Sequence, residues 1–245
     1  SLVTFEGLGD RILWDKKGLN GQSAKLGRGN ITFVKKHETT GIYVDRAIDF
    51  MERHRNEAFY LHVFPNDVHD AHVPDEAWLG KYEKYSTHPY VQKFYATLDN
   101  MDRQFGRLID SVDEMGLSEK TMIIFTSDNG PTDWPRYYKE GFTPPGWTGP
   151  LYGRKWSLYE GGIRMPFIVR WKGQVPEGKT NETTIMAAVD LFPSLHAMAG
   201  LELPSEWDLD GQDLSKALEG RKMKRKEPVF WEYAGNPGFL KPGNP

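Results

Sequence analysis

The 245-residue sequence contains no cysteine. This absence excludes disulfides, thiolate metal sites and a cysteine nucleophile among these residues. The sequence also lacks any apolar run close to the roughly 20 residues that a membrane-spanning helix needs, so no membrane partner is expected. Charge of one sign is not in excess, because 31 basic and 34 acidic residues leave a formal net charge of −3. Nucleic acid is therefore not an expected partner either, and the basic run at residues 221–226 is interpreted as a solvated linker.

What the sequence does contain is a succession of helical and strand patterns. With 38% hydrophobic residues, the chain can bury a sizeable core. The apolar spacing predicts helices over residues 41–55, 91–115 and 187–199, and a short one near 214–218. Short apolar runs predict strands over residues 58–64, 121–126, 165–171 and 228–233. Helix, buried strand and polar loop in this order predict an α/β fold with a mostly parallel sheet.

Polar side chains follow two of the predicted strands, at the end of a parallel sheet where ligands bind. Asp128 and Asn129 come after the strand at 121–126 and offer one charged and one neutral oxygen donor. Such hard donors suit calcium or magnesium better than zinc. Asp-Asn-Gly is also a common turn sequence, and taken alone that interpretation is favoured.

Two more side chains could act on an anion. His69 follows the strand at 58–64 and could serve as a general acid, whereas Lys155 could hold an anionic oxygen as a compact charge. Considered alone, each is more often an ordinary surface residue. Residues 131–156 form a long loop with aromatic residues among prolines and glycines, which is typical of a functional or mobile segment. Its rings either pack against the body or face a sugar, and the sequence favours neither.

Taken together and in order, four motifs resemble the sulfatase family. Residues 151–171, in which Lys155 precedes Trp-Ser-Leu-Tyr-Glu-Gly-Gly-Ile-Arg-Met-Pro, are similar to the second signature of that family. Residues 123–130, ending in Ser-Asp-Asn-Gly, resemble its metal-binding strand end, and residues 98–109 resemble the helix that leads into it. Asp-Leu-Phe-Pro-Ser-Leu at 190–195, with Asp-Gly at 210–211, resembles a later helix and turn. The resemblance extends from about residue 41 to the end and is specific because four motifs keep their order.

The resemblance implies an alkaline-phosphatase-like α/β fold: a mixed, mostly parallel sheet flanked by helices over residues 1–204, and the start of a small antiparallel C-terminal subdomain over residues 205–245. It implies hydrolysis of sulfate esters, on a sulfated small molecule or glycan, with a carbohydrate preferred because of the aromatic loop. Asp128 and Asn129 become two ligands of a single calcium site, only partly supplied by these residues. Lys155 contacts a sulfate oxygen, and His69 contacts the sulfate and assists the leaving oxygen. His72 is the alternative to His69.

The family mechanism uses a hydrated formylglycine that attacks sulfur while calcium and lysine neutralise the sulfate oxygens. Formylglycine is made from Cys or Ser in Cys/Ser-x-Pro-x-Arg, which does not occur in this sequence. We therefore expect it in a preceding N-terminal part, and we expect these residues alone to be inactive and to bind calcium weakly. By family expectation the protein is periplasmic or secreted, and its oligomeric state is open.

Two other functions are compatible with parts of the pattern. A phosphodiesterase or phosphonate hydrolase of the same superfamily would have His after the strand-end Asp, where this sequence has Asn129. A non-catalytic protein that binds sulfated glycans would use the same basic and aromatic residues. A Cys/Ser-x-Pro-x-Arg segment upstream would distinguish an enzyme from such a binder.

Overall fold

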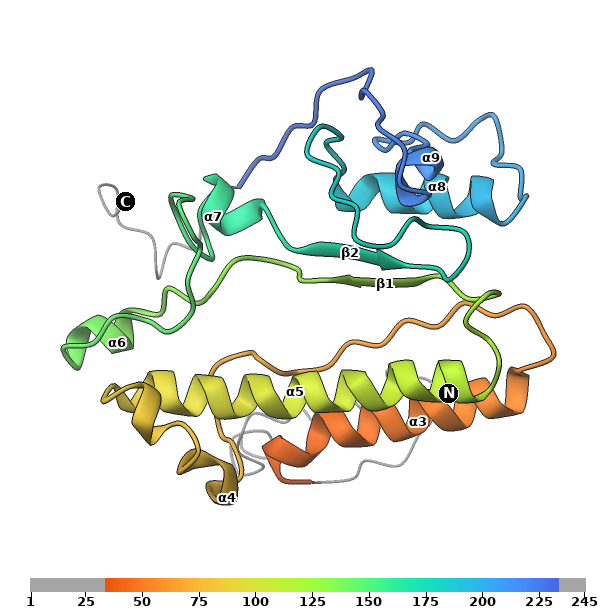
Figure 1. Cartoon of the computed structure of the whole chain (residues 1–245). Helices are drawn as coiled ribbons and strands as arrows, with labels where there is room; N and C mark the ends of the chain where they lie inside the picture. The colour runs from red at the N-terminus through yellow and green to blue at the C-terminus, as the bar shows by residue number, and fades with distance from the viewer. Residues whose placement is uncertain (1–33, 234–245) are drawn as a thin grey trace, which may run out of the picture. The chain divides into compact units, whose positions relative to one another are not determined.

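The computed structural model describes residues 34–233, which fall into two compact units (Figure 1). Unit 1 contains the described residues up to Gly116 together with residues 131–150. Unit 2 contains residues 117–130 and the described residues from 151 onward. Residues 1–33 and 234–245, which belong to the two predicted domains, lie outside the described residues.

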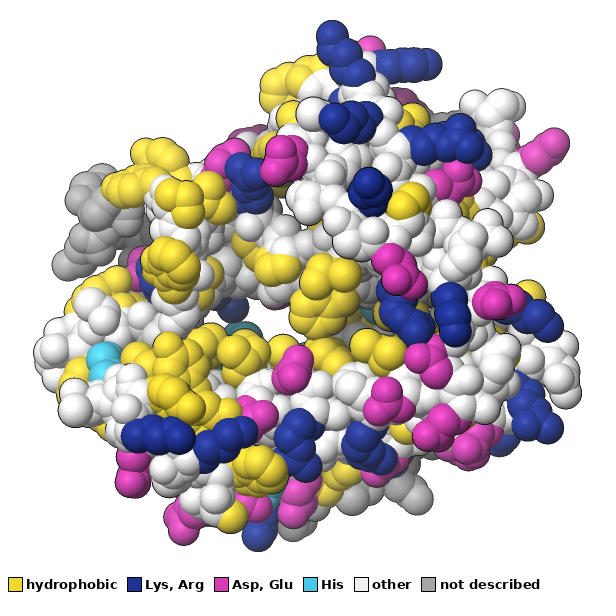
Figure 2. All heavy atoms as spheres, viewed as in Figure 1, with side chains coloured by type: hydrophobic (Ala, Val, Ile, Leu, Met, Phe, Trp, Pro, Cys, Tyr) yellow, Lys and Arg dark blue, Asp and Glu magenta, His cyan; other side chains and the backbone are white. Residues whose placement is uncertain are grey.

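Unit 1 is built on two long helices that pack against each other, α3 (Thr39–His54) and α5 (Pro89–Glu114) (Figure 1). The side chains of Val44, Ala47 and Met51 follow helical spacing and are buried, which gives α3 its inner face. Figure 2 shows charged side chains of both signs along the exposed face of these helices. Both predicted helices are thus confirmed, to within about two residues at each end.

The start of α5 explains how the chain turns into this helix. The His88 side chain accepts hydrogen bonds from the backbone N–H groups of Tyr90 and Val91, and Pro89 occupies the first helical position. Gly116 follows the helix with a φ of 69°, a conformation that favours glycine. None of the helices in residues 34–233 is long and apolar enough to cross a membrane.

The remaining elements of unit 1 are short: η1 (Lys36–Glu38), α4 (Glu76–Leu79), η2 (Glu83–Tyr85) and α6 (Pro135–Lys139). The predicted strand at 58–64 is wrong, because this segment makes no strand pairing in the described structure. Exposure alternates along it, and Tyr60 and Phe64 point outward with 73% and 69% of their surface exposed. The segment has the side-chain alternation of a strand, but a strand also needs a neighbour to pair with its backbone.

Unit 2 contains the two strands of the described structure, β1 (Ile123–Thr126) and β2 (Phe167–Arg170). They pair in antiparallel register, Ile123 with Arg170 and Thr126 with Phe167. Both strands lie where the sequence predicts them, but the expected mostly parallel pairing is not what these two strands form. An apolar run predicts burial and says nothing of the direction in which a neighbour runs.

The C-terminal part of unit 2 is helical: α7 (Glu160–Ile163), η3 (Ala188–Asp190), α8 (Leu191–Met198) and α9 (Ser215–Leu218). The predicted helix at 187–199 and the short helix near 214–218 are confirmed, whereas the predicted strand at 228–233 is irregular and leaves Phe230 86% exposed. Both α8 and α9 belong to unit 2. The domain boundary predicted at residue 204 stays a prediction.

Asp190 organises this part of unit 2. Its side chain is fully buried and accepts hydrogen bonds from the backbone N–H groups of Ala187 and Gln212, both at 2.8 Å, and from the Arg225 guanidinium. Burial raises the pKa of Asp190, but the Arg225 bond and the two backbone bonds outweigh it, so the pKa lies below its ordinary value. A buried carboxylate requires such partners.

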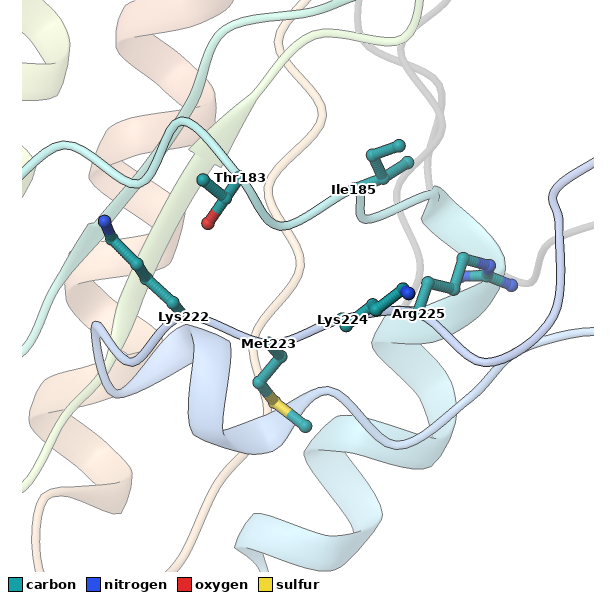
Figure 3. Close-up of a pocket in the computed structure, with 6 residues that line it drawn as sticks. All are labelled: Thr183, Ile185, Lys222, Met223, Lys224 and Arg225. Carbon is teal, nitrogen blue, oxygen red and sulfur yellow. The ribbon is translucent and has the colours of Figure 1, made fainter.

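Arg225 corrects the interpretation of the basic run as a solvated linker. Its side chain is only 7% exposed because it pairs with Asp190. The run is extended, so alternate residues face inward: Met223 and Arg225 are partly buried, while Lys222 and Lys224 are exposed. These four residues, with Thr183 and Ile185, line a cavity of about 600 Å³ (Figure 3). The lysines fit the predicted solvated face, but the arginine is a structural anchor.

Candidate functional site

The turn that follows β1 carries the two predicted metal ligands. Asp128 is exposed and Asn129 is partly exposed. The Ser127 hydroxyl donates to the backbone carbonyl of Asn129 at 3.2 Å, and the buried Gly130 N–H donates to the Gly162 carbonyl at 2.9 Å. The turn is therefore fixed at its end while its two oxygen-bearing side chains remain accessible.

Three glycines, Gly130, Gly161 and Gly162, join this turn to the rest of the predicted site, and we call them the glycine junction. A Cβ atom on Gly130 would lie 2.0 Å from the Gly161 carbonyl oxygen, and one on Gly161 would lie 2.1 Å from the Gly153 oxygen. A Cβ atom on Gly162 would lie 2.2 Å from the Ser157 oxygen. Backbone contacts backbone at all three positions, so the sequence needs glycine there for space.

The segment that carries Lys155 packs directly on this junction. The Gly161 N–H donates to the Tyr152 carbonyl at 2.7 Å, and the Ser157 N–H closes a turn onto the Arg154 carbonyl at 3.0 Å. Trp156 within this turn has a φ of 72°, which is uncommon for a bulky side chain. The structure thus brings the Lys155 turn and the Asp128–Asn129 turn together in unit 2.

The donor chemistry of Asp128 and Asn129 fits part of a calcium site. Calcium takes six to eight oxygen ligands, and a carboxylate beside an amide oxygen is a common contribution. Within residues 34–233 there is no group of three or more His, Cys, Asp or Glu side chains that could hold a metal ion. These two side chains are chemically suited to supply two oxygen ligands, and the partial calcium site stays a prediction.

The two histidines that compete for the catalytic role lie in unit 1, in the loop before α4. His69 is exposed, and its Nδ1 lies 2.5 Å from the backbone oxygen of Asp70. His72 is only 7% exposed, its Nε2 lies 3.1 Å from the Val68 oxygen, and its ring packs edge-on against Phe94. Burial lowers the pKa of His72 to about 4, so this ring is neutral near pH 7. A neutral, enclosed imidazole is poorly suited to contact a sulfate.

A polar network that sequence reasoning missed surrounds this loop. The buried Asp70 carboxylate accepts hydrogen bonds through Oδ1 from the Arg136 guanidinium at 2.7 Å and from the Tyr137 hydroxyl at 2.8 Å. Lys36 donates to the backbone oxygens of His69 and Ala71, at 2.8 and 2.5 Å. Burial raises the pKa of Tyr137 to about 12 and lowers the pKa of Lys36. The sequence offers little indication of this network. Asp70 adjoins His69, but its side-chain partners Arg136 and Tyr137 lie more than 60 residues away.

Residues 131–150, the part of the predicted 131–156 loop that lies in unit 1, are called the aromatic segment, and their rings divide into inward and outward ones. Tyr137 is fully buried and packs edge-on against Tyr90 with 4.7 Å between centroids, and Phe142 packs against His88 at 4.6 Å. In contrast, Trp147 is 88% exposed and Tyr138 is 54% exposed. Some rings therefore pack against the body of unit 1, while others point outward, where a sugar could reach them.

Comparison with known proteins agrees with these features. Residues 14–201 match the Sulfatase family. N-acetylgalactosamine-6-O-sulfatase of Bacteroides thetaiotaomicron is 29% identical over 85% of this chain and 40% of its own length. Steryl-sulfatase of Mus musculus is 32% identical over 77% of this chain and 29% of its own length. The chain therefore spans well under half the length of these relatives.

Solved structures with a similar fold are sulfatases as well. A sulfatase from Pseudoalteromonas sp. is 25% identical and superposes with a TM-score of 0.63, over 86% of this chain and 44% of that one. A protein from a study of glycosaminoglycan metabolism by Bacteroides thetaiotaomicron is 29% identical, with a TM-score of 0.61 over 77% of this chain and 38% of that one. The expected alkaline-phosphatase-like α/β fold is confirmed. With a family match over most of its length, this chain belongs to the sulfatase family.

Proposed function

We propose that the protein containing this chain hydrolyses sulfate esters. The glycine junction is the observation that supports the proposal most directly, because it holds the Lys155 turn against the Asp128–Asn129 turn through backbone contacts. An ammonium group and two oxygen donors for a divalent cation suit a compact anion whose charge must be neutralised. A phosphodiesterase of the same superfamily is the less favoured alternative, since Asn129 stands where a histidine ligand is expected there.

Each residue has a defined role in this proposal. The Lys155 ammonium binds a sulfate oxygen and offsets its negative charge. Asp128 and Asn129 supply part of the ligand set of a calcium ion, which when bound acts as a Lewis acid toward the sulfate. His69 donates a proton to the oxygen of the departing alcohol, because it is the accessible histidine of the loop. The formylglycine that sulfatases use as nucleophile is proposed to lie N-terminal to these residues.

A sulfated carbohydrate is the proposed substrate. The relative from Bacteroides thetaiotaomicron is named for a sulfated amino sugar. The exposed rings of Trp147 and Tyr138 could pack against the apolar face of a sugar. A periplasmic or secreted location, where such glycans are met, is proposed with it.

The test uses a protein in which these residues follow a Cys/Ser-x-Pro-x-Arg segment, the proposed source of the nucleophile. Sulfate release is measured from N-acetylgalactosamine 6-sulfate and from 4-nitrophenyl sulfate, with calcium and after chelation. We expect Lys155→Ala to lower kcat about 10²- to 10³-fold, as loss of one charge-stabilising donor does. Lys172→Ala, which removes an exposed lysine of the same unit, is the matched control and should leave kcat unchanged. Activity on bis(4-nitrophenyl) phosphate without sulfate release would instead favour the phosphodiesterase.

A further inference from the structure

The side chain of Asp70 anchors the loop that carries His69. Only 2% of this side chain is exposed, and Arg136 and Tyr137 both bind its Oδ1. These partners belong to α6 in the aromatic segment, 66 and 67 residues along the chain. A contact between such distant parts of the sequence fixes one loop against the other.

The chemistry of this anchor points to precise placement more than to stability. Removing the Asp70 carboxylate from water costs free energy that the attraction to Arg136 barely repays. The Arg136 side chain remains 36% exposed, so this pair is a weak source of stability. Several atoms of the cluster have no hydrogen-bond partner among the described residues: Asp70 Oδ2, His72 Nδ1 and Arg136 Nε. A polar cluster that is costly to bury fixes a single arrangement of the two loops.

The backbone on both sides of Asp70 is held as well. Lys36 donates to the carbonyls of His69 and Ala71, the residues that flank Asp70. Nearby, the buried Asp67 accepts a hydrogen bond from the Thr40 hydroxyl at 2.6 Å, which ties the loop to the start of α3. The Asp70 main chain therefore has little freedom to rotate.

This restraint reaches the His69 ring through a hydrogen bond at Nδ1. His69 Nδ1 lies 2.5 Å from the Asp70 carbonyl oxygen. A carbonyl oxygen can only accept, so Nδ1 must carry the proton in this bond. Nε2 is then the ring atom that gains and loses a proton, which is the atom a general acid uses. The direction of the Asp70 carbonyl thus sets both the tautomer and the orientation of His69.

We propose that Asp70, Arg136 and Tyr137 are positioning residues that keep a proton on Nδ1 of His69. Nε2 is then the atom that takes up a second proton from solvent and passes it to the departing oxygen. The inference deepens the proposed function and rests on it for its effect on catalysis. It also gives the aromatic segment a second role, because the same stretch of chain that presents Trp147 holds the anchor of His69.

The test compares Arg136→Met and Tyr137→Phe with Arg107→Met in the protein used to test the proposed function. Arg107 donates to Asp45 at 2.6 Å in the same unit, but both side chains are at least half exposed, so its loss is a matched control. We expect kcat to fall roughly 10- to 100-fold for Arg136→Met and less for Tyr137→Phe, with KM within about threefold, because a small misplacement of a catalytic group costs that much. Arg107→Met should leave kcat unchanged.

The second measurement is the ¹⁵N chemical shifts of the His69 ring in the same variants. A purely structural role would leave the tautomer as it is, whereas positioning predicts Nδ1 protonation in the wild type and a mixture of tautomers in Arg136→Met. If Arg136→Met does not fold, Tyr137→Phe, which removes only a hydroxyl, provides the test. Folded variants with unchanged kcat and an unchanged tautomer would overturn the inference. Absence of sulfate release by the wild type would refute the proposed function alone, because the tautomer measurement needs no activity.

Discussion

Gly161→Ala tests the glycine junction with a single methyl group. The added Cβ would lie 2.1 Å from the Gly153 carbonyl oxygen and 2.7 Å from the Tyr152 oxygen, whereas ordinary contacts begin near 3.4 Å. Both obstacles are backbone atoms, so relief requires the Lys155 segment to move by about 1.3 Å, the shortfall at Gly153. That movement also weakens the hydrogen bond from the Gly161 N–H to the Tyr152 carbonyl.

The magnitude follows from opposing contributions to the free energy of unfolding. Overpacking costs typically 1–3 kcal/mol, and the weakened hydrogen bond adds about 0.5–1.5 kcal/mol. The lower chain entropy of unfolded alanine offsets about 0.4–1 kcal/mol. We therefore expect a net loss of about 2–3 kcal/mol, which lowers Tm by roughly 5–10 °C in a protein of this size.

Thermal unfolding of the 245-residue chain, followed by circular dichroism, measures this loss. Gly106→Ala is the control, because a Cβ atom there meets nothing within 4 Å in the helix α5. Alanine should stabilise that helix by about 0.5–1 kcal/mol and raise Tm slightly. If Gly161→Ala melts at or above the wild-type temperature, the described backbone packing is wrong.

Three further changes have defined outcomes. Asp190→Asn removes the partner of a buried arginine and should cost about 3–5 kcal/mol in urea unfolding, whereas Asp110→Asn, at an exposed site, should cost under 0.5 kcal/mol. Because His72 has its pKa lowered to about 4, the unfolded chain binds more protons than the folded chain between pH 4 and 6.5. The free energy of unfolding should therefore fall by about 1.4 kcal/mol per pH unit as pH drops through that window. His72→Gln should flatten this slope, whereas His54→Gln should not. Trp147→Ala should raise KM several-fold for a sulfated sugar but not for 4-nitrophenyl sulfate, and equal KM changes for both would contradict the sugar contact.

The sequence predicted the helices well because their signal is local. The apolar spacing that marks α3 and α5 depends on neighbours three and four positions away, and their buried faces confirm it. The strand at 58–64 was not predictable in the same way. Its alternation is genuine, but whether it pairs depends on which other segment lies alongside, and that information is not local.

In the candidate site, too, the residues with a local sequence signal were predictable and those that depend on distant contacts were not. Asp128, Asn129 and Lys155 stand in sequence motifs, and at Gly161 backbone atoms occupy the space that a side chain would need. The anchor of Asp70 on Arg136 stands in no motif. Two ordinary polar residues 66 positions apart give no sign in one sequence that they will meet.

The Asp190 cluster has a practical consequence for anyone who shortens this polypeptide. Ending the chain near residue 204 would delete Arg225 and the Gln212 amide, and it would also remove Leu214, whose N–H donates to the Ser194 hydroxyl at 2.8 Å. The truncated product would expose α8 and leave a carboxylate without its cation. Expression boundaries on the C-terminal side should therefore lie beyond Lys226, and a protease cut there would be far better tolerated than one inside residues 205–225.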